Sequence, residues 1–247
     1  MTDPELDAFA SVVIVAAGRG ERFGHPAKVL AVAGGRPLLA WSLIAASQSP
    51  CVREILIVSG EHTDEAIRHL LIAMPMSIPV TLVTGGPRRQ DSVAAGVAAV
   101  SPVSDVILIH DGARPLATAA MFDACAVEAR RSGAAIVAIP ISDSLKRVHD
   151  LSDLSDLSIE ESVPRDGLWG AQTPQGFRRE LIQHAIQRTR IMDNEFTDEA
   201  SLLEALGEPV RVVPGDRTNI KVTHPEDLEL VDALLWRRSI QAQEVQR

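Results

Sequence analysis

The sequence predicts an α/β fold in which a mainly parallel sheet carries helices on both of its faces. Short apolar runs rich in β-branched residues alternate with segments whose apolar residues recur at helical spacing. The first run, residues 11–16, has the apolar, β-branched character of a strand buried on both faces. Strand–helix alternation of this kind indicates parallel strands joined by crossover helices, as in Rossmann-like folds.

The expected elements follow one another in a regular order through residue 140. The expected strands span residues 11–16, 55–59, 80–83, 106–109 and 134–140. The expected helices between them span residues 37–48, 63–73, 90–100 and 119–131. In the first of these helices, Leu38, Trp41 and Ala45 recur at the spacing of one helix face.

The rhythm breaks after residue 140. A polar excursion of about 30 residues, 141–170, contains a period-three repeat at 151–158 that reads as a loop tip, and such an excursion is either functional or an interaction arm. Helices are expected at 178–190 and 197–206, a strand at 210–213, and a last helix from Thr223 with a capping box through Glu226. We therefore expect one domain over residues 1–247, with an arm at about 141–170.

Composition excludes several classes of function. The net charge of −9 argues against a nucleic-acid or anionic-membrane surface, and no apolar run reaches the roughly 18 residues of a spanning helix. The acidic N-terminus is unlike a signal peptide. The two cysteines, Cys51 and Cys125, lie among small apolar residues and indicate reduced core thiols in a cytoplasmic protein.

Lysine usage points to candidate chemistry. Of 24 basic residues only three are lysines, namely Lys28, Lys146 and Lys221, and each lies in a motif-like segment. A compact ammonium is not equivalent to a guanidinium fork, so a chain that otherwise uses arginine has kept lysine where the difference matters. Drift in composition is the alternative explanation.

A glycine-rich stretch at residues 15–24 directly follows the first expected strand. The unpaired N–H groups of such a loop can cradle phosphates, although a tight structural turn would also explain the glycines. The spacing fits neither the dinucleotide fingerprint nor the P-loop. Arg22 and Lys28 follow, and two cations beside such a loop can neutralise a triphosphate and the charge that develops at its α-phosphorus.

Seven further blocks follow in order, at residues 85–93, 110–115, 143–147, 165–169, 172–177, 197–201 and 219–223. Together with the first loop they resemble the 2-C-methyl-D-erythritol 4-phosphate cytidylyltransferase family, the CTP-using enzymes of the non-mevalonate isoprenoid pathway. The resemblance runs from about residue 12 to 228 and implies a nucleotidyltransferase, GT-A-like fold with a protruding dimerisation arm. The chain departs from the family pattern at Ala27, where proline usually precedes the lysine, and at Pro87, where many relatives have a polar residue.

The resemblance assigns a first set of residues to the CTP co-substrate: Ala16, Ala17, Gly18, Gly86 and Ser92. A helix cap is the alternative for Ser92. A second set is assigned to substrate binding: Asp111, Arg114, Ser144, Arg165, Thr173 and Thr197. A structural ion pair is the alternative for Arg114. Asp111 ends an expected strand, where open α/β sheets bind ligands, and its oxygens suit Mg²⁺ bridging nucleotide phosphates, with capping of the next helix as the alternative.

The resemblance implies that the arm forms the contact between two subunits. In the family the arm embraces a second subunit, so Arg165 is implied to complete the partner's site in a homodimer, and a structural arginine at the base of the arm is the alternative. For Lys146, an ion pair within the arm and a ligand contact are equally open.

The reaction that the resemblance implies joins CMP from MgCTP to 2-C-methyl-D-erythritol 4-phosphate and releases pyrophosphate. Its nucleophile is a phosphate oxygen that is already anionic near neutral pH, so catalysis reduces to alignment and charge neutralisation. Arg22, Lys28 and Lys221 are the expected catalytic residues. The rival functions are a ribitol-5-phosphate cytidylyltransferase, a sugar-nucleotide pyrophosphorylase and a non-catalytic nucleotide-binding paralogue.

Overall fold

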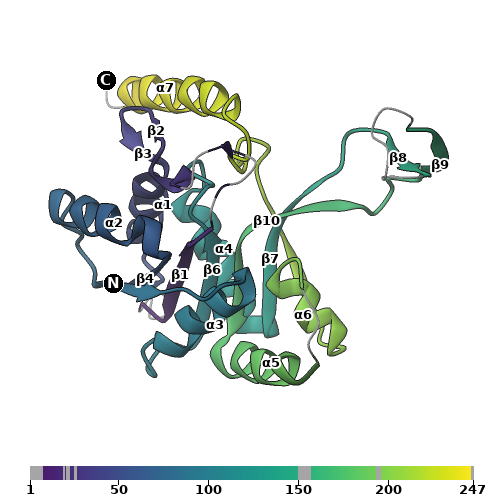
Figure 1. Cartoon of the computed structure of the whole chain (residues 1–247), viewed down its shortest axis with the longest axis horizontal. Helices are drawn as coiled ribbons and strands as arrows, with labels where there is room; N and C mark the ends of the chain where they lie inside the picture. Colours follow the sequence, from purple (N-terminus) through teal and green to yellow (C-terminus); the bar gives the residue numbers. More distant parts are fainter. Residues whose placement is uncertain are drawn as a thin grey trace.

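A seven-stranded sheet forms the centre of the protein (Figure 1). The structure is a computed structural model, and it describes residues 8–18, 20, 23–24, 27–149, 157–192 and 196–245. The strand order of the sheet is β11-β7-β10-β6-β1-β4-β5. The strands are β1 (Ala10–Ala16), β4 (Val52–Ser59), β5 (Val80–Thr84), β6 (Val106–Asp111), β7 (Ala134–Pro140), β10 (Trp169–Arg178) and β11 (Arg211–Pro214). Every expected strand is present, and the run at 134–140 coincides with β7.

The sheet is parallel except at one strand. β1 pairs in parallel with β4 and β6, β4 with β5, and β11 with β7. β10 lies antiparallel to both of its neighbours, β6 and β7. The prediction of a mainly parallel sheet is therefore confirmed, with one antiparallel strand in its interior.

Helices cover both faces of the sheet. They are η3 (Lys28–Leu30), α1 (Leu38–Ser47), α2 (Glu61–Ala73), α3 (Arg89–Ala99), α4 (Ala119–Ser132), α5 (Arg179–Met192), α6 (Glu199–Ala205) and α7 (Asp227–Val245). Side chains alternate across β1: Ile14 packs in the core beneath α1 and α4, and Val13 in the core beneath α3, α5 and α6. Both residues are fully buried, as the apolar run predicted.

The C-terminal helix α7 lies beside the small hairpin formed by β2 (Val32–Ala33) and β3 (Arg36–Pro37) (Figure 1). It packs on a third apolar cluster, in which Val231 and Leu235 of α7 meet Leu38 of α1 and Ala33 of β2. Val222, just before α7, belongs to the same cluster. This packing fixes the segment that carries Lys221.

A two-stranded hairpin stands well away from the body of the protein in Figure 1. It consists of β8 (Leu145–Val148) and β9 (Ile159–Val163), which pair only with each other. Most of the period-three repeat lies outside the described residues. Lys146 lies on this hairpin, where its Nζ donates to Ser162 Oγ at 2.6 Å.

One local prediction was wrong. The last helix begins at Asp227 rather than Thr223, and Asp227 Oδ2, not Glu226, accepts the N–H groups of Thr223 and His224. The segment around Thr173, for which no element was predicted, is part of β10. None of the described helices is long and apolar enough to span a membrane.

Candidate active site

A cavity of about 680 Å³ opens at the carboxyl ends of β1, β4, β5 and β6. Open α/β sheets bind ligands at this edge. Its lining includes residues from the loop after each of these strands, together with Lys28 and Lys221. A second cavity of about 750 Å³ lies at the opposite end of the sheet, around Arg130 and Arg178, and its lining includes none of the predicted site residues that the structure describes. The predicted site residues therefore identify the first cavity as the candidate active site.

The loops after β1 and β5 approach each other closely at the cavity wall. A Cβ atom on Gly85 would lie 2.7 Å from Ser92 Oγ and 2.9 Å from Ala17 Cβ, so only glycine fits there. Ser92 Oγ in turn accepts the N–H of Gly86 at 3.1 Å. Ser92 is therefore not the helix cap, because α3 begins at Arg89, three residues earlier.

The residues assigned to CTP surround this wall. Ala17, Gly18, Gly86 and Ser92 line the cavity, and Ala16 lies buried just below it at the end of β1. A backbone-rich surface of this kind can bring N–H groups close to a nucleotide and its phosphates.

Asp111 is the electrostatic centre of the site. It ends β6, and its side chain is 10% exposed. Its Oδ2 lies 3.0 Å from Lys221 Nζ and 3.4 Å from Arg114 Nε, and its Oδ1 lies 3.8 Å from Arg89 Nη2. Burial alone would raise the pKa of Asp111, but the charges of Lys221, Arg89 and Arg114 outweigh burial and hold this pKa below its usual range. The carboxylate is therefore ionised at neutral pH.

Lys221 reaches Asp111 because the segment before it is fixed by buried hydrogen bonds. Asn219, fully buried, donates from Nδ2 to Gln172 Oε1 at 3.2 Å and to the carbonyl of Thr173 at 3.0 Å. Arg114 Nη1 donates to the carbonyl of Asn219 at 2.8 Å. The Lys221 side chain is 40% exposed and lines the cavity, so its ammonium faces both the carboxylate and the open space.

Lys28 approaches the same cavity from η3. Burial would raise the pKa of Asp227 at the start of α7, but the N–H groups of His224 and Thr223 lower it, and the charge of Lys28 adds to that lowering. Arg22 lies outside the described residues. Two of the three expected catalytic cations, Lys28 and Lys221, thus meet at one cavity.

His110 and Thr173 support Asp111 from below. Thr173 Oγ1 accepts the N–H of Asp111 at 3.0 Å and lies 2.9 Å from His110 Nδ1. Burial lowers the pKa of His110 to about 4, so the imidazole is neutral near pH 7 and does not compete with the cations around Asp111. Thr173 is 4% exposed and is not part of the cavity lining.

Replacing Thr173 with valine is expected to destabilise the protein by about 1–3 kcal/mol, because the N–H of Asp111 would be buried without an acceptor. Urea unfolding of the variant and the parent protein measures this difference. A variant of unchanged stability but raised KM for the acceptor would instead assign the hydroxyl to direct substrate contact.

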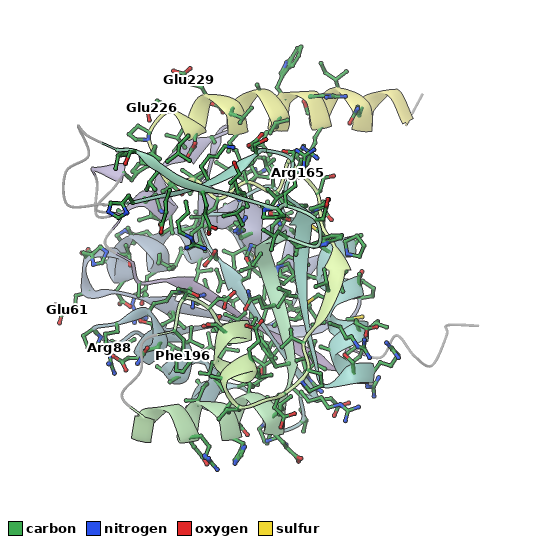
Figure 2. All side chains as sticks on the ribbon, turned by 90° about the vertical axis from the view of Figure 1, so that its right-hand side faces the viewer. Glu61, Arg88, Arg165, Phe196, Glu226 and Glu229 are labelled. Atoms are coloured by element: carbon green, nitrogen blue, oxygen red, sulfur yellow. The ribbon has the colours of Figure 1, made fainter. Side chains whose placement is uncertain are left out.

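Of the six predicted substrate residues, Asp111 lines the cavity and the other five do not. Arg114 and Thr173 contact Asp111, and the remaining three lie elsewhere. Ser144 and Arg165 are exposed residues flanking the β8–β9 hairpin, and Arg165 donates to the carbonyl of Ser142. Figure 2 shows Arg165 far from Glu61 and Arg88, which line the cavity. Thr197 is exposed just before α6.

Sequence reasoning missed one pair of residues at this site. Arg89, the first residue of α3, lines the cavity and forms two hydrogen bonds with the carboxylate of Glu199, at 2.6 and 3.1 Å. Both residues lie in recognised blocks, but no role was assigned to either. Burial raises the pKa of Glu199, although Arg89 opposes that shift.

Comparison with known proteins finds relatives that match most of this chain. The family model described as 2-C-methyl-D-erythritol 4-phosphate cytidylyltransferase matches residues 10–237. The curated protein of that name from Gloeobacter violaceus is 42% identical over 91% of this chain and 95% of its own length. The one from Synechocystis sp. is 40% identical over 92% and 97%.

Solved structures give the same result. The 2-C-methyl-D-erythritol 4-phosphate cytidylyltransferase of Thermus thermophilus is similar with a TM-score of 0.74 and 34% identity, over 91% of this chain and 98% of that one. The 4-diphosphocytidyl-2C-methyl-D-erythritol synthase of Anaerococcus prevotii has a TM-score of 0.79 and 30% identity, over 92% and 98%. By sequence and by fold, the chain belongs to the 2-C-methyl-D-erythritol 4-phosphate cytidylyltransferase family.

Proposed function

We propose that this protein transfers CMP from CTP to 2-C-methyl-D-erythritol 4-phosphate, giving 4-diphosphocytidyl-2-C-methyl-D-erythritol and pyrophosphate. Family membership supports the reaction, and one structural observation carries it. Lys28, Lys221 and Asp111 converge on a glycine-walled cavity at the carboxyl edge of the sheet. That combination provides two positive charges and an ionised carboxylate.

The chemistry requires little from the protein beyond alignment and charge. An oxygen of the acceptor phosphate attacks the α-phosphorus of CTP, and the bond from that phosphorus to the bridging oxygen of the β-phosphate breaks. Pyrophosphate leaves with the electron pair. Lys28 and Lys221 neutralise the charge that accumulates on the phosphates, and we assign Arg22 to the same task.

The donor set fits a magnesium ion held jointly by protein and nucleotide. Among the described residues no group of three or more His, Cys, Asp or Glu side chains could enclose a metal. Mg²⁺ usually binds through one or two carboxylates and substrate phosphates rather than a protein cage. Asp111 would supply the carboxylate, and the ion would neutralise charge on the phosphates.

We further propose that residues 1–247 act as one nucleotidyltransferase domain in a homodimer, with the arm at about 141–170 reaching the partner. In this arrangement Ser144 and Arg165 of one subunit reach the acceptor site of the other subunit. Thr173 and Thr197 serve the acceptor site of their own chain. Arg165 lies far from the cavity of its own chain (Figure 2), which supports its assignment to the partner's site. A cytoplasmic location suits the buried free thiols of Cys51 and Cys125.

Mixed dimers test whether Arg165 acts in the partner. Arg165→Ala and Lys221→Ala homodimers are each expected to be severely impaired, because each lacks one component of every site. Random 1:1 mixing should restore about a quarter of wild-type turnover, since half the dimers would hold one intact site of two. No recovery after subunit exchange, verified by mass spectrometry, would place Arg165 in its own chain's site.

Acceptor specificity tests the proposed reaction. With CTP and Mg²⁺, pyrophosphate release should depend on 2-C-methyl-D-erythritol 4-phosphate and should be weak with ribitol 5-phosphate. Release with ribitol 5-phosphate alone would keep the mechanism but change the substrate. Absence of release with either acceptor, from folded protein that binds CTP, would contradict an enzymatic function.

A further inference from the structure

Glu199 is a buried carboxylate that the proposed mechanism does not use. It is 4% exposed, at the first position of α6. Its neighbours fix that position, because Gln175 of β10 donates to Asp198 Oδ2 at 2.8 Å and accepts the N–H of Ala200 at 3.2 Å. The strand that carries Thr173, the support of Asp111, therefore also fixes the start of α6, where Glu199 lies.

The partner of Glu199 is an arginine that stands between two carboxylates. Arg89 Nη1 and Nη2 bind the two oxygens of Glu199 at 2.6 and 3.1 Å. The same Nη2 lies 3.8 Å from Asp111 Oδ1, which is beyond hydrogen-bond distance. A shift of about 1 Å toward Asp111 would bring Arg89 to the length of a charge-assisted hydrogen bond.

The two oxygens of Asp111 have different surroundings. Oδ2 is occupied by Lys221 and Arg114, at 3.0 and 3.4 Å. No donor from the described part of the chain makes a hydrogen bond to Oδ1. Oδ1 is therefore the oxygen of Asp111 that remains available to bind a metal cation. Arg89 is the group that can bind this oxygen in place of the cation.

We propose that Glu199 is a positioning residue: it holds Arg89 back from Asp111 Oδ1 and so keeps this oxygen accessible to the divalent cation of the bound nucleotide. The inference rests on the proposed function, in which Asp111 contacts that cation. Glu199 and Asp111 compete for the Arg89 guanidinium through their negative charges. When the charge of Glu199 is removed, Asp111 is the strongest remaining attraction for that guanidinium. An arginine bound there would both block the oxygen and repel the cation.

The Glu199→Gln variant tests the proposal, because glutamine keeps the size of the side chain and removes its charge. We expect Mn²⁺ to bind the enzyme complex with α,β-methylene-CTP at least about tenfold more weakly, by isothermal titration calorimetry, since a charge-assisted partner of Arg89 is lost. Turnover of the variant should recover toward wild type as Mg²⁺ is raised.

The Arg89→Gln/Glu199→Gln double variant separates this role from a structural one. It removes both charges, so nothing competes for Asp111 Oδ1, and Mn²⁺ affinity should return close to wild type. Ser201→Ala is the matched control: Ser201 caps the same helix through Asp198 without a hydrogen bond to Arg89. That control should leave Mn²⁺ affinity unchanged even if it lowers the unfolding temperature.

Unchanged Mn²⁺ affinity in a folded Glu199→Gln variant would overturn the proposal while leaving the proposed function intact. So would weak binding that the double variant does not restore. If only the double variant folds, near wild-type affinity supports the proposal and weakened affinity overturns it. Wild-type protein that binds the CTP analogue but no Mn²⁺ would overturn both this inference and the metal role of Asp111.

Discussion

Replacing Lys221 with alanine is expected to lower kcat roughly a hundredfold or more, since loss of one donor aimed at developing charge typically costs about 3 kcal/mol or more. Lys221 Nζ lies 3.0 Å from Asp111 Oδ2, and its side chain is 40% exposed toward the cavity. The backbone around it is fixed by Asn219 and Val222, so the fold should survive. Lys28→Ala should show a loss of the same order, because Lys28 lines the same cavity.

Steady-state kinetics at saturating CTP and acceptor measure this effect, with circular dichroism as the check on folding. Lys146→Ala is the matched control, since it removes the same charge from the hairpin, where Lys146 contacts Ser162. The control should stay within a few-fold of wild type. Near-normal turnover in either Lys28→Ala or Lys221→Ala would remove that lysine from the catalytic assignment.

Asp111→Asn is expected to abolish most activity and also to destabilise the fold. The amide would leave Arg89, Arg114 and Lys221 around a neutral group, and removing one partner of a buried charge cluster commonly costs about 3–5 kcal/mol of stability. Turnover should fall at least about a hundredfold, because the carboxylate assigned to the cation is lost.

Thermal unfolding separates the two effects of Asp111→Asn. A lowered unfolding temperature is expected for the free enzyme, and adding Mg²⁺ with CTP should stabilise the variant less than wild type. Wild-type Mg²⁺ dependence of turnover in the folded variant would contradict the assignment of Asp111 to the metal.

Most of the fold could be predicted because most strands are short runs of apolar residues that are buried in the sheet. The run at 134–140 is apolar and buried, and it forms β7 at the predicted bounds. Strands of this kind need no information from the rest of the chain. The cavity position follows from the same rule, since Asp111 and the glycine loop both come directly after parallel strands.

β10 was not predicted, and several of its buried residues are polar. Gln172 donates to the carbonyl of Asp216, and Gln175 binds Asp198 and Ala200, so each partner is distant in sequence. Polar residues at these buried positions interrupt the apolar run that would indicate a strand. The partners that satisfy these groups are known only once α6 and the segment before α7 are in place.

The same limitation applies to the candidate site. Motifs recognisable in the sequence contain Lys28, Lys221 and Asp111, and the fold brings these residues to one cavity. The pair of Arg89 and Glu199 is separated by 110 residues. Neither residue type nor local spacing indicates that this arginine binds Glu199 rather than a substrate phosphate.

The most direct test of a single in-line displacement is the stereochemical course at the α-phosphorus. One diastereomer of α-thio-CTP, reacted with 2-C-methyl-D-erythritol 4-phosphate, gives a product whose configuration can be assigned by ³¹P NMR. Inversion is expected, because the acceptor phosphate attacks directly and the chain supplies charge but no nucleophile. Retention would contradict this mechanism, since it requires two displacements through a covalent enzyme intermediate.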